Sequence, residues 1–140
     1  MNPTKENTLY LPIKQVYFDQ IIEGTKKEEY REVKHGVTAN RYLIKDGQGN
    51  YVPDPSCTEE GKEYYIDDYN NGKFPFLPKQ YKYLHLAVGY SKVRDEAIVE
   101  VTGITYEIAR TFGNPPAFAW WIQVFHLGKV VSLERKKVHP

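Results

Sequence analysis

Residues 15–31 read QVYFDQIIEGTKKEEYR, and this stretch decides the fold of the N-terminal part of the chain. From Phe18 onwards its apolar side chains recur at i, i+3 and i+4, the spacing of a helix that buries one face. Gly24 follows at the position where a left-handed residue commonly ends a helix. We therefore expect a short amphipathic helix over residues 14–23, followed by an abrupt turn.

The rest of this stretch predicts a strand with an unusual density of charge, over residues 27–34. Side chains of a strand alternate between two faces, so Lys27, Glu29 and Arg31 share one face. One face of the strand is expected to meet the core. Charge turned inward is costly unless it is paired or used on a ligand. The segment from Gly24 to Arg31 is therefore the first candidate for a functional site.

Size and composition favour one ordinary globular domain. The chain has 140 residues, of which 41% are hydrophobic and 26% charged, enough to bury a core without metal or disulfide. Nineteen basic and eighteen acidic residues leave a net charge of +1, so bulk charge is no argument for nucleic acid. The twelve tyrosines favour both strand structure and a surface that stacks on rings.

Other features bear on location and on metal chemistry. Cys57 is the only cysteine, which excludes an internal disulfide and fits a reducing compartment. The sequence has neither an apolar run of membrane-spanning length nor a signal-peptide pattern at its start, so we expect a cytoplasmic protein without a membrane partner. The four histidines lack metal-binding spacing, and His85, in an apolar strand, is expected in the core. The sequence predicts no metal and no cofactor.

Alternating and apolar runs predict further strands. These strands are expected at residues 8–13, 82–88, 96–107 and 118–127, and residues 40–45 fit either a strand or a short helix. A loop is expected at 111–117 and a basic tail at 134–140. Residues 36–82 are rich in Pro, Gly and Asn, which predicts a long irregular insertion held down by aromatic side chains. The predicted fold class is α+β, a small mixed β-barrel with one short N-terminal helix.

Several of these segments together resemble the signature of the ASCH domain, a family of the PUA-like superfamily of small β-barrels. The N-terminal matches are LPIK at 11–14, YFD at 17–19, Ile22, and the run Gly24-x-Lys26-x-x-Glu29-x-Arg31. The later matches are GYSK at 89–92, IVEVTGI at 98–104 and VFHLG at 124–128. The resemblance covers about two thirds of the chain and omits the insertion.

The resemblance implies one PUA-like domain over residues 1–140, with residues 36–82 as an insertion within it. It also implies a cleft beside the first helix that binds RNA or a nucleotide-like small molecule or nucleobase. The expected ligand-binding residues are Lys14, Tyr17, Lys26, Glu29 and Arg31.

Two other functions remain open. Some members of the family cleave RNA, and one bacterial branch hydrolyses the acetyl amide of N4-acetylcytidine. That branch uses a lysine at the position of Lys26, which makes Lys26 the candidate catalytic residue of a hydrolase. It has a threonine where this chain has Glu29, and a lysine beside a glutamate is better suited to donating hydrogen bonds than to attack. The third interpretation is a non-catalytic module that binds another protein through the aromatic insertion.

Overall fold

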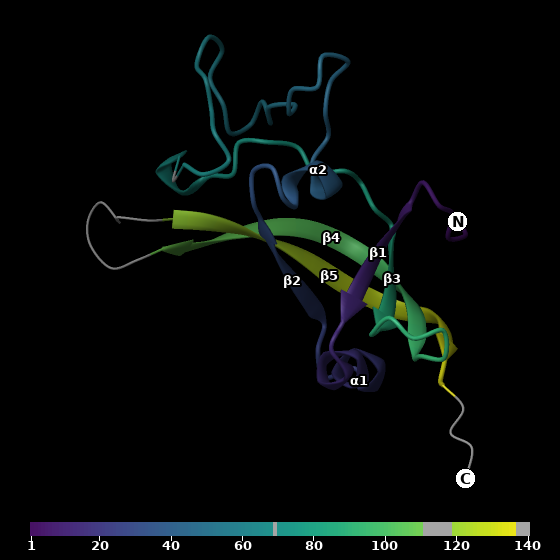
Figure 1. Ribbon diagram of the computed structural model, residues 1–140. Coiled ribbons are helices and arrows are strands. Elements are labelled where there is room, and N and C mark those ends of the chain that lie inside the picture. Colours follow the sequence, from purple (N-terminus) through teal and green to yellow (C-terminus); the bar gives the residue numbers. More distant parts are fainter. Residues whose placement is uncertain (69, 111–118, 137–140) are drawn as a thin grey trace. The chain divides into compact units, whose positions relative to one another are not determined.

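The computed structural model describes residues 1–68, 70–110 and 119–136 of the chain (Figure 1). Within these residues the fold is mixed α+β, as predicted, with a five-stranded sheet in the order β1-β3-β4-β5-β2. The strands are β1 (Thr8–Ile13), β2 (Glu28–Val33), β3 (Tyr83–Val88), β4 (Glu96–Arg110) and β5 (Ala119–Glu134). The helical segments are α1 (Gln15–Glu23), α2 (Ala39–Tyr42) and the short 3₁₀ turn η1 (Asn70–Gly72).

The sheet is open, with β1 and β2 as its two edges, so the closed barrel predicted from the sequence is not formed by the described residues. Strand β1 pairs in parallel with β3, and β3 pairs antiparallel with β4. Pro12 lies in β1, and its missing N–H is tolerated at an edge, where no further strand requires a donor. A proline here predicts the edge or the end of a strand, and the edge position is confirmed.

The described residues form two compact units. The first consists of residues 1–29, 80–103 and 125–136. Its core contains alternate side chains of the paired strands, such as Leu11 and Leu86, together with Phe18 and Ile21 of α1. Helix α1 ends at Gly24, whose φ of 84° is left-handed. The predicted helix and its glycine terminator are therefore confirmed.

Strand β2 shows the expected alternation of burial. Glu29 and Val33 are buried, whereas Tyr30 and Glu32 are exposed and Arg31 is half-buried. Because β2 carries charge on both faces, one charged face has to meet the core. The face that carries Glu29 is the one turned inward.

The second unit consists of the described parts of residues 30–79 and 104–124, and it contains most of the insertion. The predicted irregular chain held by aromatic residues is confirmed, since Phe74 is buried and stacks on Tyr106 with ring centroids 4.0 Å apart. The adjacent tryptophans of β5 point to opposite faces, because Trp121 is 2% exposed and Trp120 39%. The ambiguous residues 40–45 begin within the short helix α2.

Strand β5 is longer than predicted. The strand predicted from the sequence ends before Gly128, but β5 continues through this glycine to Glu134. A Cβ at this glycine would lie 2.8 Å from Cγ2 of Thr102, so glycine allows β5 to pass close to β4 here. The loop predicted at 111–117, residue 118 of the predicted strand, and residues 137–140 of the basic tail lie outside the described residues.

Candidate functional site

The turn after α1 places Lys26. The backbone N–H groups of Thr25 and Lys26 both donate to the carbonyl of Gln20, at 3.0 and 3.1 Å. The N–H of Gly24 donates to the carbonyl of Ile21 at 3.1 Å. These bonds use helix-terminal carbonyls that would otherwise lack donors. The position of Lys26 is therefore set by the way the helix ends.

Lys26 and Glu29 form an ion pair that is largely withdrawn from water. The Nζ atom of Lys26 lies 3.6 Å from Oε1 of Glu29, and the two side chains are only 18% and 8% exposed. The ring of Tyr17, on α1, also lies near this ammonium, since Nζ is 5.4 Å from the ring centroid. Three of the five predicted site residues therefore meet at one place in the first unit.

The other two predicted residues are placed differently. Lys14 is exposed and occupies the N-cap position of α1, where its carbonyl accepts hydrogen bonds from the N–H groups of Tyr17 and Phe18. Arg31 lies two residues beyond Glu29 on β2 and belongs to the second unit. Because side chains alternate between the two faces of a strand, Arg31 lies on the same face of β2 as Glu29.

This cluster, Tyr17, Lys26 and Glu29, combines three kinds of recognition. The ammonium of Lys26 is a positive charge and a hydrogen-bond donor, and the carboxylate of Glu29 is an acceptor. Tyr17 adds an aromatic ring that is 44% exposed, which leaves surface for a stacking partner. An ammonium donates strong hydrogen bonds to phosphate or carbonyl oxygens, and a carboxylate accepts them from amino groups.

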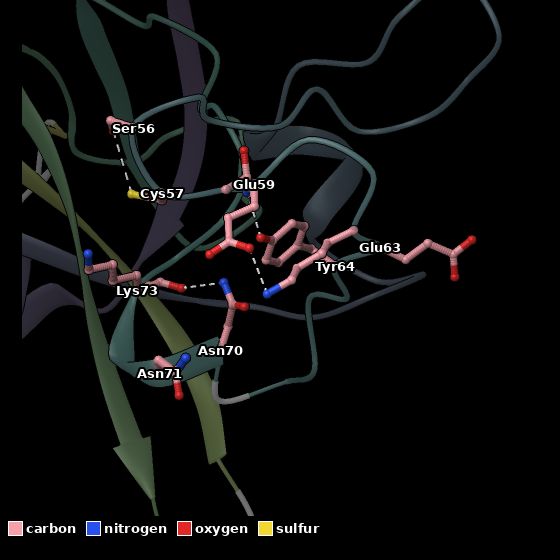
Figure 2. Close-up of a pocket in the computed structure, with 10 residues that line it drawn as sticks. Ser56, Cys57, Glu59, Glu63, Tyr64, Asn70, Asn71 and Lys73 are labelled. Atoms are coloured by element: carbon pink, nitrogen blue, oxygen red, sulfur yellow. Dashed lines mark hydrogen bonds and ion pairs between the residues drawn. The ribbon is translucent and has the colours of Figure 1, made fainter.

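A polar hollow lies in the insertion, where the sequence predicted no site. It has a volume of about 440 Å³ (Figure 2). Its lining residues are Ser56, Cys57, Thr58, Glu59, Lys62, Glu63, Tyr64, Asn70, Asn71 and Lys73. Asn70 and Asn71 both have left-handed backbone, with φ of 50° and 54°, which asparagine tolerates better than most residues. The Asn-Asn-Gly run is the one sequence signal for this turn.

The polar groups of this hollow mainly bond one another. Lys62 pairs with Glu59 at 2.7 Å, and the N–H of Glu59 donates to the hydroxyl of Tyr64 at 2.7 Å. The side-chain amide of Asn70 donates to the carbonyl of Lys73 at 2.9 Å, and Figure 2 shows Glu63 pointing away from the other labelled side chains. These hydrogen bonds and this ion pair hold the insertion together, so the polar groups of the hollow are explained by a structural role.

His85 lies on a part-exposed face of the sheet, so its predicted place in the core is wrong. Its Nε2 lies 3.0 Å from Oε1 of Glu96, and its side chain is 35% exposed. Strand β3 is apolar on both faces except at this residue, which is why pattern alone assigns the histidine to the core. Within residues 1–68, 70–110 and 119–136, no three His, Cys, Asp or Glu side chains are grouped to hold a metal ion. None of the described helices has the length and apolar character to cross a membrane.

Comparisons of the chain with models of protein families, with curated proteins and with solved structures find no match.

Proposed function

We propose that this protein is an ASCH-type, PUA-like domain that binds RNA or a nucleotide-like ligand at the cluster of Tyr17, Lys26 and Glu29. The observation that carries the proposal is the ion pair between Lys26 and Glu29, whose side chains are largely withdrawn from water, with the ammonium of Lys26 near the ring of Tyr17. All three residues belong to the pattern on which the family resemblance rests. The PUA-like part of the proposal is supported by that pattern and by a mixed sheet with an early helix.

The withdrawn ion pair supports a binding role on energetic grounds. Removing two charges from water has a free-energy cost that their mutual attraction often fails to offset. Such a pair is therefore a weak source of stability, and a hydrophobic pair of similar volume often serves the fold equally well. Binding of a ligand by both charged groups would explain the presence of this ion pair, which its small contribution to stability does not.

The donor and acceptor suit a nucleotide. The ammonium of Lys26 matches a phosphate oxygen or a base carbonyl, and the carboxylate of Glu29 matches an exocyclic amino group such as that of cytosine. The ring of Tyr17 offers a surface on which a base stacks, a contact worth about 1–3 kcal/mol in single-strand binders. We therefore place a base against Tyr17 and its polar edge against the ion pair.

The test is the affinity of a fluorescently labelled single-stranded RNA of mixed sequence, measured by anisotropy at low salt. Lys26→Ala is expected to weaken binding by at least about tenfold, because a charge-assisted hydrogen bond contributes about 1.5–3 kcal/mol. Lys27→Ala is the matched control, since it removes the same charge from the exposed neighbour of Lys26. If Lys26 contacts a phosphate, its loss also lowers the salt slope by about one unit.

Two results would overturn the proposal. One is an absence of RNA or nucleoside binding by the unaltered protein at low salt. The other is an equal loss of affinity in Lys26→Ala and Lys27→Ala, which would show that bulk charge is sensed. The hydrolase alternative is tested on the same variants, by turnover of RNA and of N4-acetylcytidine. Turnover that disappears in Lys26→Ala and persists in Lys27→Ala would move the assignment from binding to catalysis.

A further inference from the structure

A pair of aromatic rings lies on one face of the sheet in the first unit. The parallel register of β1 and β3 sets Tyr10 beside His85, and the antiparallel register of β3 and β4 sets His85 beside Ile98. Paired residues of neighbouring strands share a face. The rings of Tyr10 and His85 meet at a centroid distance of 5.2 Å and an interplanar angle of 86°.

A chain of polar contacts holds these rings in place. Nε2 of His85 lies 3.0 Å from Oε1 of Glu96, and the same oxygen lies 3.4 Å from Nη2 of Arg94. The guanidinium of Arg94 in turn lies 5.7 Å from the centroid of the Tyr10 ring, and its Nη1 donates to the carbonyl of Gly89 at 3.2 Å. The rings are therefore oriented before any ligand arrives, which lowers the entropy cost of binding.

The ring pair lines a cavity of about 330 Å³. Its lining residues are Pro3, Thr4, Lys5, Thr8, Tyr10, His85 and Ile98. This volume is at the lower end of the range of about 300–1,000 Å³ that is usual for small-molecule sites. Tyr10 is 37% exposed and the side chain of His85 is 35% exposed. The cavity is therefore of a size for one ring system, and both rings retain surface to contact it.

We propose that Tyr10 and His85 form a ring-binding subsite for a planar nitrogen heterocycle, a nucleobase, with Lys5 facing a phosphate attached to it. Because the two ring planes are nearly perpendicular, a flat ligand that stacks on one ring meets the other edge-on, a favourable arrangement for aromatic groups. Lys5 supplies a positive charge at the same cavity. The choice of a nucleobase rests on the proposed function, but the subsite shares no residue with the cluster of Tyr17, Lys26 and Glu29.

The experiment is an NMR titration of the full chain with cytidine and adenosine monophosphates, following the ring signals of tyrosine and histidine. Ribose 5-phosphate and inorganic phosphate are the probes without a base. We expect both nucleotides to shift the ring signals of Tyr10 and His85, and both probes without a base to leave them in place. Tyr10→Leu keeps an apolar side chain and removes the ring, so the affinity for the nucleotides should fall about tenfold. Tyr90→Leu is the control, because Tyr90 is 87% exposed and lies outside the cavity.

The outcomes separate this subsite from the proposed function. Nucleotide shifts at Tyr10 and His85 that persist in Lys26→Ala support a subsite distinct from Lys26, whether or not Lys26 binds RNA. If RNA binding depends on Lys26 and nucleotides leave the signals of Tyr10 and His85 unmoved, the subsite is rejected while the proposed function stands. Shifts caused equally by inorganic phosphate would reject the ring-binding role and leave only an anion contact at Lys5.

Discussion

Asp95 and Arg135 join the start of β4 to the residue that follows β5. Nη1 of Arg135 donates to Oδ2 of Asp95 at 3.0 Å, although Asp95 is only 4% exposed. The same carboxylate accepts the backbone N–H of Lys136 at 2.8 Å and the side-chain amide of Gln15 at 2.9 Å. One buried carboxylate therefore connects the first residue of α1, the start of β4 and the chain beyond β5.

Replacing Asp95 by alanine should destabilise the protein by about 1–3 kcal/mol, because the donors left without this acceptor include the backbone N–H of Lys136. The measurement is the free energy of unfolding from urea denaturation. Asp95→Asn should cost less than Asp95→Ala, because its amide oxygen still accepts one of these hydrogen bonds.

Asp19 provides the matched control for this carboxylate. It also accepts from Arg135, at 2.9 Å, but its side chain is 41% exposed, so water replaces the lost partner. Asp19→Ala should therefore destabilise the protein less than Asp95→Ala. Equal losses in the two variants would contradict the argument that burial makes Asp95 the more important partner.

Acid should weaken the hydrogen bonds and ion pairs that Asp95 and Asp19 accept. The backbone hydrogen bond from Lys136 and the side-chain bonds from Gln15 and Arg135 lower the pKa of Asp95, with burial opposing them. The hydrogen bond from Arg135 is the main reason that the pKa of Asp19 is also lowered. A carboxyl group with a depressed folded-state pKa stabilises the fold above its unfolded pKa of about 3.9, and this stability is lost as the pH falls through the folded value.

We therefore expect the urea midpoint to fall as the pH is lowered below about 4. In Asp95→Asn this decline should be shallower, because the substituted residue does not titrate. The midpoint measured from neutral to strongly acidic pH in both proteins checks this expectation. Parallel curves for the two proteins would show that Asp95 does not contribute to the acid response.

Local patterns in the sequence predicted the parts of the fold that depend on neighbours in the chain. The helix before Gly24 and the inward charge of Glu29 follow from spacing and alternation over a few residues. The pairing of Tyr10 with His85 could not be predicted in this way, because it depends on the register between strands distant in sequence. The continuation of β5 through Gly128 was missed for a similar reason, since the close approach of Thr102 that this glycine permits comes from another strand.

Adding one methyl group at Gly128 should show how closely β4 and β5 approach. In Gly128→Ala the new Cβ would lie 2.8 Å from Cγ2 of Thr102, so the side chain of Thr102 or the strands must shift, at a cost of about 1–3 kcal/mol in the free energy of unfolding. Gly103→Ala is the control, because its nearest neighbour is Cδ2 of His126 at 3.9 Å. That variant should be neutral or slightly stabilising, since alanine restricts the unfolded chain.

The double variant Gly128→Ala with Thr102→Ser tests the cause of this effect. Serine removes Cγ2 and retains the hydroxyl, which in Thr102 donates to the carbonyl of His126 at 3.2 Å. It should therefore recover most of the lost stability. A double variant no more stable than Gly128→Ala would mean that the contact with Cγ2 is not the source of the loss.

In the second unit, Tyr106 and Gln123 form a hydrogen bond whose value can be measured by a double-mutant cycle. The hydroxyl of Tyr106 donates to Oε1 of Gln123 at 2.8 Å, and burial raises the pKa of this tyrosine. Gln123 is fully buried, and within the described part of the chain its Nε2 is a buried side-chain atom without a hydrogen-bond partner. The side-chain amide of Gln123 therefore has a hydrogen bond at Oε1 and, among the described residues, a buried donor, Nε2, that is unsatisfied and destabilising.

Tyr106→Phe should destabilise the protein by about 1–3 kcal/mol, because Oε1 of Gln123 then also loses its partner. Adding Gln123→Met, which has a similar length and no amide, removes both polar groups at once. The double variant should therefore be more stable than Tyr106→Phe and fall within about 1 kcal/mol of the unaltered protein. Urea unfolding of the unaltered protein, of the single variants Tyr106→Phe and Gln123→Met, and of the double variant gives the coupling energy. Purely additive losses would show that this hydrogen bond does not couple the two side chains.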